Sequence, residues 1–244
     1  MSPTHEAGCL VCGAPLRYLE VLVELPCACC GAVGSADARC EGSGHFVCDA
    51  CHGRAAFAVI EHLCRTSAET DMHALLATVR AHQSVAMHGP EHHAIVPAVI
   101  LTCYRNLGGA VTDEQLASVI TRGAKIPGGF CGFAGTCGAA VGVGIAFAAL
   151  IGSSPVKADE RATSLRVTQA VLGALAELQA ARCCQRDAWV ALAAAAELSV
   201  ELLDRPLIAA GGWTCQQSER NRQCLGPSCP LHPPGPADLS KSVP

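Results

Sequence analysis

Apolar residues recur every three or four positions through most of the chain beyond residue 53, as on the buried face of an α-helix. Thr112 and Gln115 have the spacing of a capping box, which predicts a helix that begins after Thr112 and runs to about Lys125. The same periodicity predicts helices over residues 55–65, 71–82, 158–181 and 187–203. The predicted fold class is therefore mainly α.

The first 52 residues have a different pattern. Residues 18–25 partly alternate between apolar and polar positions, which predicts a strand or one arm of a hairpin. From Pro206 the chain becomes rich in glycine, proline and cysteine. We therefore divide the chain into a small zinc-ribbon-like module (residues 1–52), an all-helical domain (53–232) and a disordered tail (233–244).

The segment from residue 125 to residue 157 carries no charge between its terminal lysines, and residues 137–152 are strongly apolar. A Gly138-x-x-x-Gly142 spacing would let such a helix pack closely against another helix within a membrane. The run is only about sixteen residues long, however, and it contains four glycines. We therefore expect a buried core helix rather than a membrane span.

Composition narrows the classes of function. Half of the 244 residues are hydrophobic, so a sizeable core is expected, and the net charge of −4 offers no surface for nucleic acid. The seventeen cysteines are an odd number, and the N-terminus has no secretory signal. We therefore expect a cytoplasmic protein whose thiols are metal ligands or redox groups rather than structural disulfides.

Cysteine pairs in the first 52 residues have the spacing of metal-binding knuckles, in which two thiolates grip one tetrahedral ion. The predicted first zinc site contains Cys9, Cys12, Cys27 and Cys30. The predicted second site contains Cys40, His45, Cys48 and Cys51. The ligand pairs combine either sequentially, as in these two sites, or in a crossed order like that of RING-like modules. In both cases a closed four-ligand site is structural and supplies folding energy to a small module.

Three imidazoles and one carboxylate lie within residues 88–93: His88, Glu91, His92 and His93. His88 and His92 are candidate metal ligands, and Glu91, His92 and His93 are candidate catalytic groups. His88, Glu91 and His92 also match the inverted zinc-peptidase pattern, in which Glu91 would be the general base. Gly89 and Pro90 argue against one continuous helix there, so a zinc hydrolase is the lesser alternative. The remaining alternative is a polar helix cap.

Seven further cysteines lie on predicted loops and helix ends. Cys137 ends a glycine-rich loop and precedes the apolar helix, so the helix dipole should lower the pKa of its thiol and make it a candidate catalytic thiolate. Soft thiolates at this density favour an iron–sulfur cluster or a second metal in the helical domain. The candidate cofactor ligands are Cys131, Cys137, Cys183, Cys184, Cys215, Cys224 and Cys229.

Three motifs behind the cysteine-rich head resemble those of an uncharacterised prokaryotic family, a domain of unknown function often found in anaerobes and methanogens. They are HGPEHH at residues 88–93, GGFCGFAGTCGA at 128–139 and RCCQRD at 182–187. The resemblance extends over about residues 9–230 and implies no particular activity.

Residues 128–152 are also similar, more faintly, to the redox family named C-GCAxxG-C-C. In that family a cysteine-bearing helix precedes a glycine-rich loop that ends in Cys-Gly-Ala. Here the corresponding helix carries His92 and His93 instead, which leaves open mixed ligation or a histidine proton donor. The resemblance places Cys183 and Cys184 near that family's later cysteines.

These observations favour a metal-binding, thiol-dependent redox or sulfur-handling enzyme, either an oxidoreductase or a sulfur transferase. A redox or sulfur-transfer protein would be its partner, and neither nucleic acid nor a membrane is expected. The alternative from another class is a non-catalytic zinc-binding docking protein.

Overall fold

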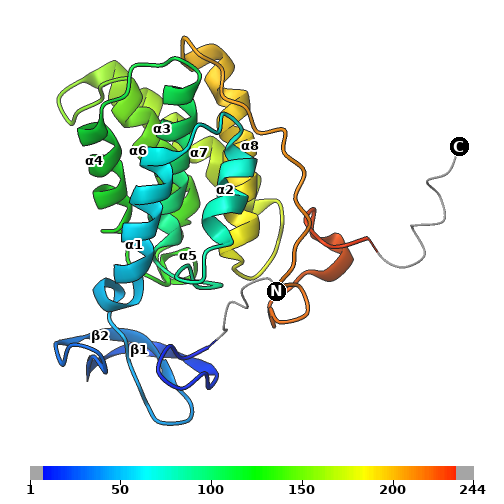
Figure 1. The fold of residues 1–244 in the computed structure, drawn as a ribbon. Helices are drawn as coiled ribbons and strands as arrows, with labels where there is room; N and C mark the ends of the chain where they lie inside the picture. The colour runs from blue at the N-terminus through cyan, green and yellow to red at the C-terminus, as the bar shows by residue number, and fades with distance from the viewer. Residues whose placement is uncertain (1–7, 235–244) are drawn as a thin grey trace, which may run out of the picture.

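This computed structural model describes residues 8–234 of the chain (Figure 1). They contain two antiparallel strands, eight α-helices and one 3-10 helix. Their bounds, in chain order, are β1 Leu16–Pro26, β2 Val33–Cys40, α1 Asp49–Thr66, α2 Met72–Arg80, α3 His92–Asn106, α4 Asp113–Gly123, α5 Phe130–Phe133, α6 Gly138–Leu150, α7 Ala158–Ala176, α8 Cys184–Leu202 and η1 Gly226–Ser228. The predicted mainly α class is confirmed. Most of the predicted tail, residues 235–244, lies outside the described part.

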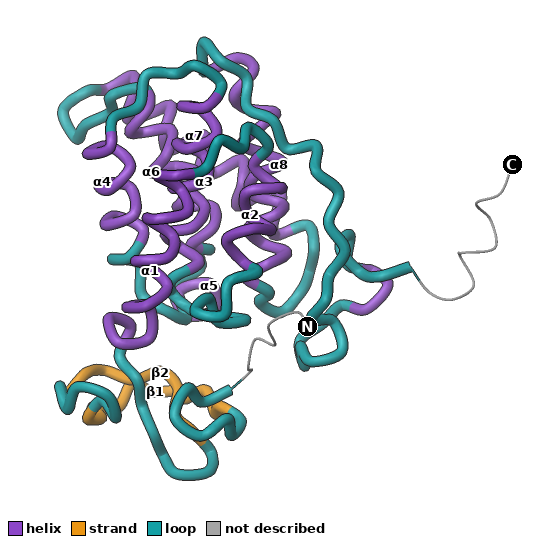
Figure 2. The backbone as a smooth tube through the Cα atoms, in the orientation of Figure 1, coloured by secondary structure: helices purple, strands orange, loops and turns teal. Residues whose placement is uncertain are grey.

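The strands form a hairpin at one end of the molecule, drawn in orange in Figure 2. Leu16 pairs with Cys40 and Pro26 with Val33, and the register shifts between Tyr18 and Val23. The strand predicted over residues 18–25 is thus confirmed within β1. Both faces of β1 are largely exposed to solvent, so the head has little apolar core of its own. Bound metal ions can stabilise a module that has so little core.

Helix α1 belongs to both parts of the molecule. Its first turn contains Cys51, beside the strands, and its later turns bury Ala56, Ile60 and Cys64 in the helical core. The predicted domain boundary after residue 52 therefore falls inside one continuous helix. A helix of this kind transmits the position of the head directly to the bundle.

Helix α3 is the centre of the bundle and packs against α1, α2, α4, α6 and α8 (Figure 1). Every residue from Ala94 to Tyr104 is buried, as expected for a helix that is covered on all sides. Pro97 lies inside α3 and has no N–H to donate to the carbonyl of His93. Helix α3 begins at His92, two residues after Pro90.

Helix α6 lies within the apolar segment 137–152, for which the sequence predicts a core helix rather than a membrane span. Its small residues bring it close to α3: a Cβ on Gly142 would lie 3.0 Å from Pro97 and 3.1 Å from Val96. Val143 and Phe147 are completely buried in the common core. Within residues 8–234, no helix combines the length and apolar character required to cross a membrane.

The remaining helices follow the predicted pattern with shifted ends. Helix α4 begins at the capping box of Thr112 and Gln115, as predicted. Helix α7 ends at Ala176 rather than near 181, and α8 begins at Cys184, three residues earlier than predicted. After α8 the chain returns beside the bundle toward the end that carries the head (Figure 2). Asp71 anchors this return by accepting from the backbone N–H groups of Ala210 and Gly211.

Candidate functional site: two metal-ligand groups and a thiol-rich helix end

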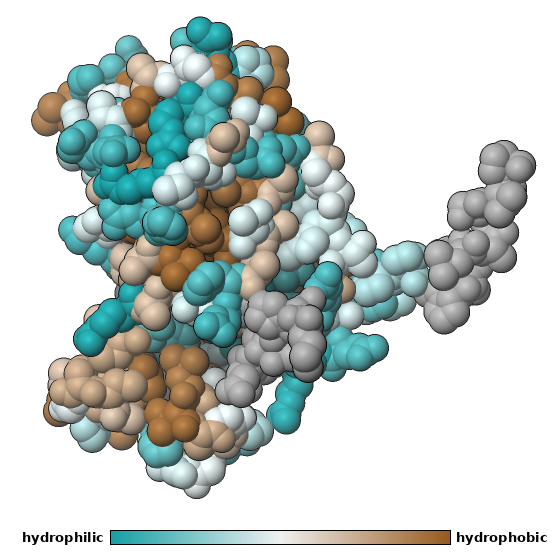
Figure 3. Space-filling view, viewed as in Figure 1, coloured by the Kyte–Doolittle hydropathy of each residue, from teal (hydrophilic) through white to brown (hydrophobic). Residues whose placement is uncertain are grey.

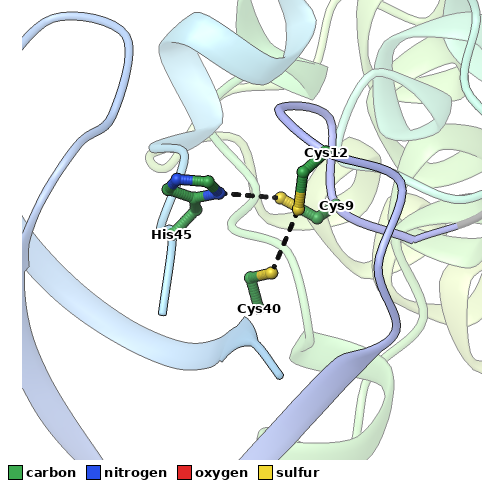
Figure 4. Close-up of side chains that lie close together, drawn as sticks. All are labelled: Cys9, Cys12, Cys40 and His45. Carbon is green, nitrogen blue, oxygen red and sulfur yellow. Dashed lines mark hydrogen bonds between the residues drawn. The ribbon is translucent and has the colours of Figure 1, made fainter. Parts of the chain in front are cut away.

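The first ligand group consists of Cys9, Cys12, Cys40 and His45, whose ligand atoms all lie within 4.8 Å of one another (Figure 4). The Cys12 and Cys40 sulfurs are 3.4 Å apart, and Cys9 Sγ is 3.7 Å from His45 Nδ1. Zinc–sulfur bonds of about 2.3 Å in a tetrahedron place two sulfurs about 3.8 Å apart. The donors and their spacing therefore fit a closed structural zinc site.

The second ligand group consists of Cys27, Cys30, Cys48 and Cys51, again within 4.8 Å of one another. The sulfurs of Cys30 and Cys48 are 3.8 Å apart. Cys27 Sγ accepts from the backbone N–H groups of Cys29 and Cys48, the arrangement that stabilises a metal-bound thiolate. Four thiolates fit zinc as well as the Cys3His set of the first group does.

The two groups are crossed rather than sequential. The pair Cys9 and Cys12 shares its site with Cys40 and His45, while Cys27 and Cys30 share theirs with Cys48 and Cys51. The predicted first site of Cys9, Cys12, Cys27 and Cys30 is therefore wrong, and the crossed alternative is correct. The reason is the hairpin, which places Cys40, at the end of β2, opposite the start of β1. The zinc-ribbon description is not confirmed.

The pKa values of the head thiols are shifted in the way expected for closely spaced ligands of a cation. Donation from the Cys48 N–H, opposed by burial, lowers the pKa of Cys27 to about 6. Hydrogen bonds from Ser43 and other groups, also opposed by burial, lower the pKa of Cys40 to about 6. Hydrogen bonding to Cys30 and Cys48 raises the pKa of Cys51 to about 12. Crowded thiols cannot all ionise without a positive charge between them, and a divalent metal supplies that charge.

Glu91 connects the head to the helical domain. Its carboxylate is completely buried, lies 3.1 Å from His52 Nδ1 of α1 and accepts from the backbone N–H of Ala86. Burial works against the imidazolium of His52, but the hydrogen bond and the charge of Glu91 raise its pKa overall. Glu91 is thus engaged in a buried ion pair.

His88 is held by Asn221 of the C-terminal segment. His88 Nε2 lies 3.3 Å from the Oδ1 of Asn221, whose amide Nδ2 donates to Cys183 Sγ at 3.6 Å. Burial, with a smaller effect of the Arg182 charge, lowers the pKa of His88 to about 4. The imidazole is therefore neutral at neutral pH, and its Nδ1 is buried without a hydrogen-bond partner.

His92 and His93 point to different neighbours. The guanidinium Nη1 of Arg80 lies 2.7 Å from His92 Nε2, and the Ala86 carbonyl lies 2.9 Å from the same nitrogen. His93 Nδ1 lies 2.9 Å from the Ile126 carbonyl, and its ring occupies the space beside Gly138. Burial lowers the pKa of both imidazoles, and Arg80 lowers that of His92 further.

The peptidase pattern is not assembled as a zinc site. His88 precedes α3 and His92 begins it, so the two imidazoles do not share one continuous helix. Arg80 places a positive charge beside His92, where a metal ion would have to bind. Within residues 8–234 no third group of three or more Cys, His, Asp or Glu ligand atoms lies as close together as the two head groups.

The charge of Asp187 acts on four cysteines of the helical domain. Cys131 lies on α5, Cys137 precedes α6, and Cys183 and Cys184 lie at the start of α8. Asp187 accepts from the Arg186 guanidinium at 2.8 Å and from the Cys183 N–H at 3.4 Å. Its negative charge contributes to a raised pKa for all four thiols, so they share one electrostatic environment.

The prediction of a thiolate at Cys137 is wrong. The N–H groups of Ala139 and Ala140 do lower the pKa of Cys137, as expected at a helix start. Burial outweighs them and, with Asp187, raises the pKa of Cys137 to about 11. Burial likewise raises the pKa of Cys184 to about 12, against the Gly89 N–H that donates to its sulfur. These thiols are protonated at neutral pH.

The last three cysteines belong to the returning segment. Cys215 is buried and accepts from the Gln217 N–H at 3.4 Å, and Cys224 accepts from the Gly226 N–H at 3.3 Å. Cys229 is half-buried. Their predicted role as cluster ligands stays a prediction. All seventeen cysteines, which lie within the described residues, are free thiols.

A cavity of about 930 Å³ separates the head from the helical domain. The walls on the head side include Tyr18, Asp37 and His45. The opposite walls include Arg182, His88 and Gly89, which contacts Cys184 through its N–H. The cavity therefore reaches Arg182, the residue that precedes Cys183 in the chain.

Sequence reasoning missed the polar residues that support this region. Arg80 reads as an ordinary cation in the last turn of a helix, yet only 2% of its surface is exposed. Gln185, Gln217 and Asn221 are also buried, and no spacing rule marks them. Only proximity in the folded chain identifies such residues.

The fold and these groups define a mainly helical protein with a cysteine-rich head that could hold two metal ions. The chain belongs to the family of unknown function DUF5714, whose profile matches residues 60–232. The match covers the helical domain and the returning segment but none of the head ligands. Comparison with curated proteins and with solved structures gave no significant match. The resemblance to a family of unknown function is thus confirmed, while the motifs and the similarity to the redox family stay predictions.

Proposed function

We propose that this protein is a thiol-dependent redox or sulfur-handling protein whose head carries two structural zinc ions. The observation that carries the proposal is that four thiols from three separate segments, Cys131, Cys137, Cys183 and Cys184, all feel the charge of Asp187. Structural need does not explain four thiols at one end of a bundle whose core is already filled by aliphatic side chains.

Graded exposure supports exchange chemistry at these thiols. Cys131 is exposed, Cys137 and Cys184 are half-buried, and Cys183 is buried. An exposed thiol can meet a partner disulfide, and the thiols behind it can resolve the mixed disulfide and carry off two electrons and two protons. A bond between Cys183 and Cys184 would be strained because the residues are adjacent, so Cys184 would pair with Cys131 or Cys137.

A resident iron–sulfur cluster or second metal in the helical domain is the other form of this proposal. The thiol donors suit such a centre. In the described residues, however, their sulfurs do not form a ligand group like those of the head. This arrangement favours thiol chemistry over a permanently bound cluster.

Thiol mapping under mild oxidation tests the proposal. The zinc-loaded protein, purified without oxygen and assayed for zinc, iron and sulfide, is treated with oxidised glutathione and its cysteines are identified by differential alkylation and mass spectrometry. We expect two zinc ions and a disulfide that joins Cys184 to Cys131 or Cys137. Cys184→Ser should abolish this bond, whereas Cys29→Ser, at an exposed cysteine outside both ligand groups, should not. Oxidation confined to the head would contradict the proposal, and bound iron with sulfide would establish the cluster form.

A docking role is the second candidate, and the surface of the head favours it. Val21, Leu22 and Val33 are 73%, 63% and 67% exposed, and apolar surface gathers over the two strands in Figure 3. Exposed apolar patches often mark sites of protein association. Two results together would make docking the function. The four thiols of the helical domain would stay reduced in the oxidation experiment, and the double variant Val21→Ser/Leu22→Ser would no longer bind a partner protein.

The sequence-based expectations for location and partners join this proposal. A thiol protein without disulfides suits a reducing cytoplasm. Its partner would be another redox or sulfur-transfer protein, and the net charge of −4 makes nucleic acid an unsuitable partner.

A further inference from the structure

Helix α5, which carries Cys131, has little hold on the core of the bundle. It lies at the end of the bundle that faces the strands (Figure 1), and none of its four residues is buried. Within residues 8–234, the hydrogen bond and the ring contact that join residues 127–136 to other segments both come from the head. The position of Cys131 therefore depends on the head.

Two carboxylates of the head hold the start of this segment. Asp49 Oδ2 accepts from the backbone N–H of Gly128 at 3.0 Å. Gly129, the N-cap residue of α5, has a φ of +77°, and a Cβ at this position would clash with Asp37 Oδ2. Glycine alone combines this backbone conformation with room for the carboxylate, so Asp37 packs directly against the start of α5.

The pairing of β1 with β2 is irregular at the residues that contact α5. Tyr18 pairs with Ala38, after which residues 19–22 of β1 lie opposite Asp37 alone. Bulges of this kind turn side chains away from the regular alternation of a strand. Tyr18 and Asp37, on either side of the irregularity, are the hairpin residues whose side chains meet the α5 segment.

The Tyr18 ring connects α5 to the start of α8. Its centroid lies 6.4 Å from the centroid of the Phe133 ring and 5.1 Å from the guanidinium carbon of Arg182. Phe133 follows Cys131 on α5, and Arg182 directly precedes Cys183, the N-cap residue of α8. Ring pairs and cation–π contacts at these separations are attractive. One side chain of the head thus ties together two segments that carry thiols.

We propose that the head regulates the redox thiols through Tyr18, a positioning residue that holds the helix of Cys131 close to the start of α8 and so favours a disulfide between Cys131 and Cys184. This inference rests on the proposed function and names the regulation of the same site. The stability of a disulfide increases with the effective concentration of its two thiols, which is highest when both are held in place. A docked head therefore lowers the reduction potential of the pair, and a released head raises it.

The oxidation takes its oxidant from outside the chain. Cys131, the exposed thiol, attacks oxidised glutathione, and the first glutathione leaves with the proton of Cys131. Cys184 then attacks the mixed disulfide at Cys131, and the second glutathione leaves with the proton of Cys184. The chain has lost two electrons and two protons, and the glutathione disulfide has gained them as two thiols. Docking of the head acts on the second step, in which the two segments must meet.

Titration of the zinc-loaded full chain in glutathione buffers tests the inference, with each cysteine peptide identified by mass spectrometry. Tyr18→Ala should lower the equilibrium constant for the Cys131–Cys184 disulfide about tenfold, because its two lost contacts are each worth severalfold. The reduction potential should then rise by about 30 mV, and more Cys131 should remain as the mixed disulfide. Tyr18→Phe keeps the ring and should match the wild type. Glu20→Ala, at an exposed position of the same strand, should do so too.

Phe133→Ala removes the ring contact from the side of the bundle and leaves the head unaltered. It should raise the potential in the same direction, and it replaces Tyr18→Ala if that variant loses zinc. Zinc is counted in every variant, so that a shift at two bound ions reports the docking of the head and not its unfolding.

The outcomes separate this inference from the proposed function. Equal potentials in the wild type and in the zinc-retaining Tyr18→Ala and Phe133→Ala variants would overturn the inference. A shift in Tyr18→Phe as large as in Tyr18→Ala would also overturn it, and so would a disulfide that joins Cys184 to Cys137 instead of Cys131. Each of these results leaves the redox proposal standing. If none of the four thiols of the helical domain is oxidised, both fall.

Discussion

His88 shows how one polar contact fixes the state of a titratable group. With Nε2 near Asn221 Oδ1, the amide oxygen can only accept, so the proton resides on Nε2 and Nδ1 carries the lone pair. Burial then keeps the ring neutral, with a pKa lowered to about 4. His88 is therefore a permanent link between the 86–90 loop and the returning segment at neutral pH.

This link predicts a dependence of stability on acid. The unfolded chain protonates His88 below about pH 6.5, whereas the folded chain resists protonation until about pH 4. The contribution of neutral His88 to the free energy of unfolding is fully present above pH 6.5. It falls as the pH drops below this value, by at most about 1.4 kcal/mol per pH unit. Urea unfolding of the wild type and His88→Gln at pH 7, 6 and 5 measures the effect.

The comparison between the two proteins removes the contribution of the head. Any loss of metal from the head in acid affects both chains equally, so the wild type should approach the stability of His88→Gln as the pH falls. A stability difference that stays constant between pH 7 and pH 5 would contradict the low pKa of His88.

Cys137 shows which residue-scale inferences sequence can support. The sequence correctly placed Cys137 at the start of a helix, and the stabilising N–H groups are present. The sign of its pKa shift could not be predicted, because the burial of the thiol depends on how distant segments of the chain pack around it. Cys64 and Cys103 lie among the apolar residues of α1 and α3, and both are completely buried.

At the scale of elements, the approach of α4 to α3 depends on a glycine. A Cβ on Gly123 would lie 2.5 Å from the His93 carbonyl oxygen and 2.6 Å from the Ala94 Cα, both backbone atoms that cannot turn aside. We expect Gly123→Ala to lower the free energy of unfolding by about 1–3 kcal/mol, the range for overpacking.

Gly173 in α7 provides the matched control. A Cβ there meets nothing within 4 Å, and the residue is helical. Gly173→Ala should raise stability by about 0.5–1 kcal/mol because alanine favours helix. Chemical unfolding of both variants provides the test, and an equal effect of the two substitutions would show that α3 and α4 are not in this contact.

Elements with strong local signals were predictable, and their ends were less so. The capping box of α4 and the uninterrupted apolar pattern of α6 are encoded within a few residues. Helix α8 begins at Cys184 rather than near 187. The Asp187 side chain accepts from the N–H of Cys183, the N-cap residue, and so stabilises the first turn. That hydrogen bond is not visible in the hydrophobic periodicity.

At the scale of the whole molecule, the crossed ligand pairs make a prediction about zinc content. Cys12 and Cys40 belong to one site and Cys30 to the other. The double variant Cys12→Ser/Cys40→Ser should therefore keep one zinc ion, whereas Cys12→Ser/Cys30→Ser should lose both. Native mass spectrometry counts the ions, and Cys29→Ser should keep two. Sequential pairing would reverse the results of the two double variants.

The association of head and bundle is the part that sequence could not provide. Contacts between residues far apart in the chain form it: His52 with Glu91, Asp49 with the Gly128 N–H at 3.0 Å, and Arg182 stacked 5.1 Å from the Tyr18 ring centroid. Knuckle spacing predicted the eight head residues that form the two ligand groups. Only the hairpin determined their pairing, and only the folded chain brought Arg80 to Gln185 and Gln217.

The central claim is that Cys131, Cys137, Cys183 and Cys184 form one redox unit that is separate from the metal sites. A redox titration of the zinc-loaded protein in glutathione buffers, with the oxidation of each cysteine read by mass spectrometry, tests it most directly. We predict one two-electron transition among these four thiols, with two zinc ions retained throughout. A tenfold change in the ratio of oxidised to reduced protein should then correspond to a change of about 30 mV in potential. Oxidation of these thiols only in step with zinc loss, or no transition among them at any potential, would contradict the claim.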